Sequence, residues 1–128
     1  MGLITKMRRQ NAIYWPPAGA DGYGQPTYGE LVELILTDGG VNYRVRWEDK
    51  SEQYLDAQGT TRTSSAVVYV PALPGPAEIV VGGYLWLGVR ADLTDEVYPR
   101  NNPGAGEVMR FEKIPNLKAT EFLRTVYL

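Results

Sequence analysis

The side chains that carry most enzyme chemistry are scarce in this sequence. None of the 128 residues is histidine or cysteine, which removes the imidazole base, the Ser–His nucleophile pair and the thiolate. Carboxylates remain as possible acid–base pairs. Asp49 lies close in sequence to Glu52, and a second cluster comprises Asp92, Asp95 and Glu96. Because both clusters lie among polar residues typical of solvated loops, we predict no catalytic residues.

No cofactor-binding motif is complete in the sequence. Gly22-Tyr23-Gly24 lacks the third glycine of a dinucleotide-binding loop, and no Gly-Lys-Ser/Thr run follows it. The carboxylates at 92–96 have neither the Asp-x-Asp-x-Asp-Gly order nor the later bidentate glutamate of a calcium loop. We therefore expect no nucleotide, metal or other cofactor.

The charge balance restricts the partners that the chain can bind. The formal net charge is −2, so the molecule offers no strong positive field to a phosphate backbone, and we expect it not to grip nucleic acid by itself. Nine tyrosines and three tryptophans leave open an alternative, an oligonucleotide-binding barrel whose aromatic rings stack on bases. No apolar run approaches the length of a membrane span, so no membrane partner is predicted.

The elements that must position these side chains are predicted to be strands. Fourteen glycines and nine prolines imply many turns, and residues 41–47 alternate apolar and polar side chains as a half-buried strand does. Further strands are expected at 13–15, 31–36, 66–70, 107–114 and 122–128, with a hairpin whose arms 79–81 and 84–87 flank Gly82-Gly83. The predicted fold class is mainly β: one domain over 1–128, a small β-barrel or sandwich of about six to seven strands with long Gly/Pro-rich loops.

Several segments allow more than one interpretation. Residues 31–36 fit a strand or a helix, and the Asp38-Gly39-Gly40 turn after them favours a hairpin. The last segment, 122–128, matches a helical stripe as well as a strand, and in a β context we favour the strand. We expect a helical turn within 91–96, and irregular loops at 16–29 and 99–106 because of their prolines and glycines.

Landmarks spread along the chain resemble one protein family. They are Met1-Gly2-Leu3 with Lys6-Met7-Arg8, Arg46-Trp47-Glu48-Asp49 followed by Ala66-Val67-Val68-Tyr69-Val70, the run Val81-Gly82-Gly83-Tyr84-Leu85-Trp86-Leu87-Gly88, and the ending Ile114-Pro115-Asn116-Leu117-Lys118-Ala119-Thr120-Glu121-Phe122-Leu123. Together they resemble the head-completion or stopper proteins of long-tailed bacteriophages. The resemblance implies a structural protein and not an enzyme: a β-barrel assembled in the host cytoplasm into the neck of the virion.

The resemblance also implies a set of partners. The chain would form a homo-oligomeric ring of roughly six or twelve copies. The phage adaptor and portal would lie on its head side, and a tail-terminator or tail-tube protein on its tail side. Double-stranded DNA would pass through the ring without sequence-specific binding. A tail-terminator protein of the same neck shares the small β character and is an alternative assignment.

A hairpin that faces the axis of such a ring would act as its gate. Residues 49–64 are our candidate because they join two expected strands and because the stretch 48–56 has four acids against one base, a local charge of −3. Repeated around a ring, this charge would repel the phosphate backbone and let DNA slide. The predicted channel-facing residues are Asp49, Glu52, Asp56, Gln58 and Gly59, the last with positive φ in a turn.

Partner contacts are predicted at the amino end and at the two irregular loops. The amino end is a basic arm, because its three cations precede the first acid, Asp21; such a run is either a solvated end or a docking arm. The loops carry tyrosine and arginine, the side-chain types that commonly anchor interfaces. The predicted interface comprises Lys6, Arg8, Arg9, Tyr23, Tyr28, Tyr98 and Arg100.

Overall fold

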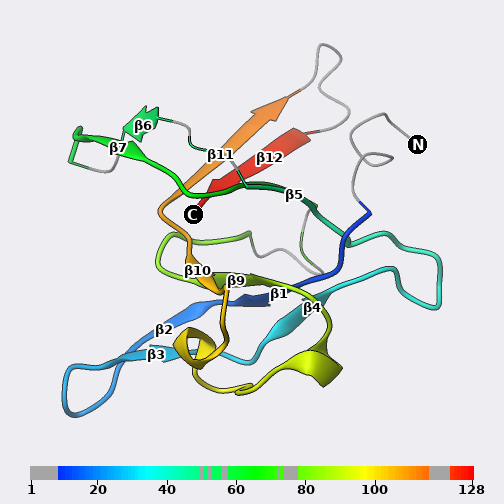
Figure 1. Ribbon diagram of the computed structural model, residues 1–128, viewed down its shortest axis with the longest axis horizontal. Coiled ribbons are helices and arrows are strands. Elements are labelled where there is room, and N and C mark those ends of the chain that lie inside the picture. Colours follow the sequence, from blue (N-terminus) through cyan, green and yellow to red (C-terminus); the bar gives the residue numbers. More distant parts are fainter. Residues whose placement is uncertain are drawn as a thin grey trace.

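Two antiparallel four-stranded sheets form the body of the protein (Figure 1). The computed structural model describes residues 9–49, 51, 53–55, 58–71, 73, 78–115 and 122–128. Short strands, turns and two 3₁₀ turns account for most of these residues, and the predicted mainly β class is confirmed. In the described part of the chain, no helix is long and apolar enough to cross a membrane.

The first sheet is built around β1 (Ala12–Trp15), whose four residues are all buried. β1 lies between β4 (Val32–Leu34) and β9 (Tyr84–Leu87), and β10 (Gly106–Glu107) pairs with the other side of β9. Alternate residues of β1 enter different clusters: Ala12 and Tyr14 join the main core, whereas Ile13 and Trp15 join a smaller one on the opposite face. Since both faces are covered, an uninterrupted apolar run is what this central strand requires.

The second sheet is built around β8 (Val67–Val70), the apolar run that the sequence predicts as a strand covered on both sides. β8 pairs with β5 (Arg46–Glu48) and with β12 (Phe122–Tyr127), and β11 (Arg110–Pro115) completes the order β11-β12-β8-β5. The C-terminal segment is therefore a strand, as favoured. Its six residues pair with all six of β11, so the end of the chain holds this sheet together.

The two sheets pack as a sandwich and are hydrogen-bonded to each other at two places. On one side, Gln10 before β1 and Val45 before β5 exchange backbone hydrogen bonds of 2.9 and 2.7 Å. On the other side, Val108 donates to the Gly83 carbonyl of the first sheet, and the next residue, Met109, donates to the Tyr127 carbonyl of the second, each at 2.8 Å. These joints fix the sheets around a common core to which both contribute buried residues.

Two further hairpins project from the sandwich. One consists of β2 (Pro17–Ala20) and β3 (Pro26–Tyr28), and the other of β6 (Gln53–Leu55) and β7 (Thr61–Thr63) (Figure 1). The expectation of an irregular loop over 16–29 is therefore wrong. Proline has no backbone N–H to donate. Both strands of a two-stranded ribbon are edge strands, so a proline can stand where an N–H would face solvent, and it does not prevent pairing there.

Two other predictions are corrected by the pairing. The strand expected over 41–47 is reduced to β5 plus single bridges at Asn42 and Val45, because this stretch changes partners as it passes from one sheet to the other. The hairpin expected around Gly82-Gly83 does not form, since β9 pairs with β1 and β10 instead of with 79–81. A Cβ atom on Gly83 would lie 2.6 Å from the Trp15 carbonyl oxygen, so this glycine permits the close approach to β1.

The ambiguous segments resolve as follows. Residues 31–36 form β4 and one arm of a hairpin that turns at 37–41, where Thr37 donates to the Val41 carbonyl at 2.9 Å. The helical turn expected within 91–96 occurs as η1 (Arg90–Asp92). The loop expected at 99–106 begins with η2 (Pro99–Asn101). The strand expected at 107–114 is divided between β10 and β11, because Val108 lies where the chain changes sheets.

A candidate partner-binding groove

The β2–β3 hairpin and the excursion 90–105 lie side by side, and two concavities open between them on either side of Tyr28. We call them together the Tyr28 groove. The first has a volume of about 310 Å³ and the second of about 280 Å³. The first is lined by Asp21, Gln25, Tyr28, Tyr98, Arg100 and Asn101, and the second by Tyr28, Gly29, Glu30, Arg90, Glu96 and Val97. The groove therefore brings together three residues of the predicted interface, Tyr28, Tyr98 and Arg100.

The hairpin wall of the groove is shaped by its turn. The Asp21 carboxylate accepts hydrogen bonds from the backbone N–H groups of Tyr23 and Gln25, at 2.8 and 3.0 Å, and Asp21 N–H donates to the Gln25 carbonyl at 2.9 Å. An aspartate that satisfies the turn backbone in this way is a common turn device. Tyr23, also predicted as an interface residue, is 93% exposed at this turn and does not line the groove.

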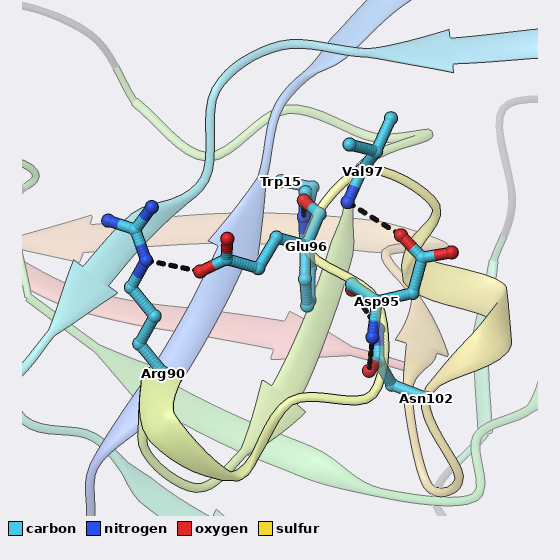
Figure 2. Close-up of polar contacts among 6 residues, drawn as sticks. All are labelled: Trp15, Arg90, Asp95, Glu96, Val97 and Asn102. Atoms are coloured by element: carbon cyan, nitrogen blue, oxygen red, sulfur yellow. Dashed lines mark hydrogen bonds and ion pairs between the residues drawn. The ribbon is translucent and has the colours of Figure 1, made fainter.

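The opposite wall is organised by Asn102, a buried amide (Figure 2). Its Oδ1 accepts the N–H groups of Thr94 and Asp95 at 2.9 and 3.0 Å, and its Nδ2 donates to the carbonyls of Asp95 and Pro99 at 2.7 and 3.3 Å. One side chain thereby satisfies four backbone groups that a loop without regular pairing would leave unmatched. The excursion is thus a defined structure, although its composition predicts only an irregular loop.

Asp95 adds a second set of bonds to the same loop. Its Oδ1 accepts the N–H groups of Val97 and Tyr98, and its Oδ2 accepts the Asn101 amide at 2.8 Å. These bonds, first of all the one from Tyr98, lower the pKa of Asp95 below the ordinary value of 3.8. The carboxylate considered in the sequence for catalysis or metal binding therefore shapes the groove wall.

Two indoles attach the excursion to the first sheet. Trp15 of β1 is fully buried and its Nε1 donates to the Glu96 carbonyl at 2.8 Å, while Trp86 of β9 donates to the Pro103 carbonyl at 2.9 Å. Sequence analysis places these tryptophans in expected strands and assigns them no contact with a loop. For Trp15, the signal that it also holds a loop is that a buried indole N–H needs an acceptor.

The floor between the two concavities is aromatic. Tyr28 packs edge-on against Tyr84 of β9, with ring centroids 5.4 Å apart and an interplanar angle of 87°. Arg100 Nε donates to the Tyr84 hydroxyl at 3.1 Å, so the guanidinium is held against this pair. Burial, followed by the neighbouring Tyr84 phenol, raises the pKa of Tyr28 above the ordinary value of 10.0.

The second concavity is acidic. Arg90 and Glu96 form an ion pair across it, and the carboxylates of Glu33 and Glu30 also act on the Arg90 guanidinium and help to raise its pKa. Three carboxylates therefore act on one cation, a local charge of −2. Sequence reasoning missed this feature because the acids are distributed over residues 30–33 and 96, which only the fold brings together.

Exposed apolar side chains lie along the excursion. Val97 is 63% exposed and Tyr98 is 56% exposed, next to each other in the chain and on different concavities of the groove. Asp95 fixes the backbone of both residues, so their side chains are held in defined positions at the surface. A surface with apolar, aromatic and acidic groups on a fixed backbone is suited to bind a polypeptide segment.

The predicted gate hairpin lies apart from the groove. Gln58 and Gly59 are exposed at its turn, and Gly59 has the expected positive φ of 81°. Asp49 accepts the Trp47 indole N–H at 3.0 Å at the start of the segment. Glu52 and Asp56 lie outside the described residues.

The base of the gate hairpin is attached to the second sheet. Tyr54 is buried and stacks on Tyr127 of β12 at 5.4 Å, and Arg110 of β11 donates to the Leu55 carbonyl. The segment 49–64 contains three acidic and two basic residues, since Arg62 of β7 adds a cation beyond the stretch 48–56. Its net charge is therefore −1, a weaker acid excess than the one counted up to Asp56.

The remaining residues of the predicted interface belong to the basic arm. Lys6 and Arg8 lie outside the described residues, and Arg9 is exposed beside Gln10, at the end of β1 away from Trp15.

Comparison with protein-family models, curated proteins and solved structures finds no match to this chain.

Replacing Asp95 with asparagine is expected to remove a pH-dependent part of the stability. Because the folded-state pKa of Asp95 lies below 3.8, the ionised carboxylate stabilises the fold above about that pH, and this contribution is lost as the pH falls through the lower folded-state pKa. Urea unfolding of both proteins, followed by tryptophan fluorescence, measures the difference in unfolding free energy. The difference should be constant near neutral pH and shrink in acid; the same difference at every pH would contradict this assignment.

Proposed function

We propose that this protein is a structural head-to-tail connector of a tailed bacteriophage, a stopper or head-completion protein that assembles as a ring. The single observation that carries the proposal is the Tyr28 groove. Two segments chosen as partner-contact loops from composition lie together as one concave surface, and three of the chosen side chains line it. The groove backbone is fixed by Asn102 and Asp95 before any partner arrives, so binding costs little ordering entropy.

The gate hairpin supports the same proposal. Its base is held by Tyr54 and Arg110, whereas Gln58 and Gly59 at its turn are exposed. A hairpin with a fixed base and an exposed turn can project into a channel. Each copy contributes a net charge of −1 from residues 49–64, and ring symmetry repeats it around the axis, where it would disfavour adhesion of DNA.

The ring is tested with the purified full-length chain. Native mass spectrometry and negative-stain microscopy over a range of concentrations should show a closed ring that forms as the concentration rises. Binding of single-stranded DNA, measured by anisotropy at low and physiological salt, should be absent. A chain that stays monomeric and binds DNA in a salt-sensitive way would instead be an oligonucleotide-binding barrel.

The position in the virion is tested separately. Cryo-electron microscopy of particles should place the chain in an axial ring directly below the portal and adaptor. A ring adjacent to the tail tube would assign the chain as a tail terminator of the same neck. Density off the axis, or none, would overturn the connector proposal.

A further inference from the structure

The groove begins at one end of β1, and Arg9 and Gln10, which follow the basic arm in the sequence, precede the other end. We propose that the arm of one copy, residues 1–8, docks in the Tyr28 groove of a second copy. The proposal deepens the connector function and rests on the ring proposed above. It names the contact by which one subunit would hold the next.

The groove offers an acidic and an apolar subsite to an incoming segment. Glu30 and Glu96 line the second concavity together with the cation Arg90, and the Glu33 carboxylate also acts on the Arg90 guanidinium. Val97, 63% exposed, lies on the same concavity. A ligand that matches this surface must carry positive charge and apolar side chains within a few residues of each other.

The arm has this composition. Lys6 and Arg8 are its only charged side chains, so it carries two positive charges, equal and opposite to the local charge around Arg90. Leu3, Ile4 and Met7 are interleaved with them. Opposite charge across an interface accelerates association and fixes orientation, while apolar contacts supply most of the burial.

The placement of arm and groove favours exchange between copies. The arm precedes Gln10 in the sequence, and the backbone bonds of Gln10 to Val45 fix this residue at one end of β1. The groove begins at the other end, where Pro16 accepts the Gly29 N–H at 2.8 Å and Trp15 binds the Glu96 carbonyl. Six residues of extended chain, about 20 Å, separate the two. A donor and an acceptor at opposite ends of one subunit make a heterologous contact, which closes into rings when the rotation permits.

The arm could instead fold back onto its own subunit, because eight extended residues span up to about 27 Å. The two arrangements differ in their dependence on concentration. Docking in a second copy is bimolecular, so it is lost on dilution, whereas docking in the same copy is not.

The first experiment changes one charge on each side of the contact. Native mass spectrometry and analytical ultracentrifugation of full-length Glu30→Lys and of Arg8→Glu should both show loss of the ring at concentrations where the unmodified chain is fully assembled. Asp38→Lys is the matched control, since it makes the same charge change in an exposed turn near the arm end of β1. Rings that persist in both variants would overturn the proposal while leaving the connector function standing.

Mixing the two variants gives a result that only a head-to-tail contact produces. Glu30→Lys retains a normal arm and Arg8→Glu retains a normal groove, and the reversed arm of the second variant attracts the reversed groove of the first, so a one-to-one mixture should assemble although neither variant assembles alone. The double variant Arg8→Glu/Glu30→Lys should recover the ring in part, because its two reversed charges again attract. Recovery of compact monomers instead would show docking within one chain and would overturn exchange between copies.

A peptide experiment keeps the contact testable if the purified chain forms no ring. A fluorescent peptide of residues 1–10 should bind the full-length chain saturably, measured by anisotropy, and bind Glu30→Lys at least about tenfold more weakly. Its affinity should fall with added salt, and Asp38→Lys should bind it normally. Absent or Glu30-independent binding would overturn the arm–groove contact. Peptide binding with no ring in solution or in virions would overturn the connector function alone.

Discussion

Asn102→Ala is expected to lower the free energy of unfolding by about 2–4 kcal/mol and to weaken partner binding at the Tyr28 groove. The buried amide satisfies four backbone groups, and its removal leaves the N–H groups of Thr94 and Asp95 without that acceptor. A buried donor or acceptor that loses its partner costs about 1–3 kcal/mol, and water entering the site recovers part of that cost. Urea unfolding measures the stability, and anisotropy with the 1–10 peptide measures the groove.

Asn101→Ala is the matched control for this prediction. Asn101 is the neighbouring residue, carries the same amide, is exposed, and donates one hydrogen bond to Asp95. Its loss should cost less than about 1 kcal/mol, since water replaces an exposed bond. Equal effects of the two substitutions would mean that the groove wall does not depend on the buried amide.

The sequence predicts the strands whose burial comes from their own residues. The run at 67–70 is apolar and β-branched, and it is buried between two partner strands whichever strands those are. β1 is predicted for the same reason. In both cases, the preference of the segment and its place in the sheet agree, so no tertiary information is needed.

The strand predictions that were wrong depend on which partner strand is available. The turn at Gly82-Gly83 satisfies the local rules for a hairpin, yet Gly82 donates to the Val108 carbonyl and Ile79 enters the main core. A two-residue turn contributes little against these long-range contacts. Local signals of this kind predict where a chain bends, but not with which strand it pairs.

The groove was predictable in residue type and not in geometry. Tyr28, Tyr98 and Arg100 could be selected because tyrosine and arginine in loops commonly bind partners. Glu30 and Glu96 could not, because 66 residues of sequence separate two acids that line one concavity. The same holds for Asn102, whose role depends on four backbone groups that no sequence pattern places around it.

Replacing residues 56–60 of the gate hairpin with Asn-Gly is expected to give particles with assembled necks that lose their genomes. The two-residue turn connects Leu55 to Thr61, which already pair, so the ladder of β6 and β7 is retained while the tip is removed. The contacts of Tyr54 with Tyr127 and of Arg110 with Leu55 remain in place. Subunit folding and ring contacts should therefore be unchanged, and only the tip that we propose to project into the channel is lost.

Electron microscopy of the mutant particles measures the outcome as the fraction of filled heads, which should fall several-fold. The control replaces residues 38–40 with Asn-Gly, since this change also shortens a hairpin and also removes one carboxylate, but on the turn at 37–41. Its heads should stay filled. If the tip variant retains DNA as well as the control does, hairpin 49–64 is not the gate. Loss of the neck itself, with a subunit that still folds, would instead show that the tip contacts a neighbouring protein.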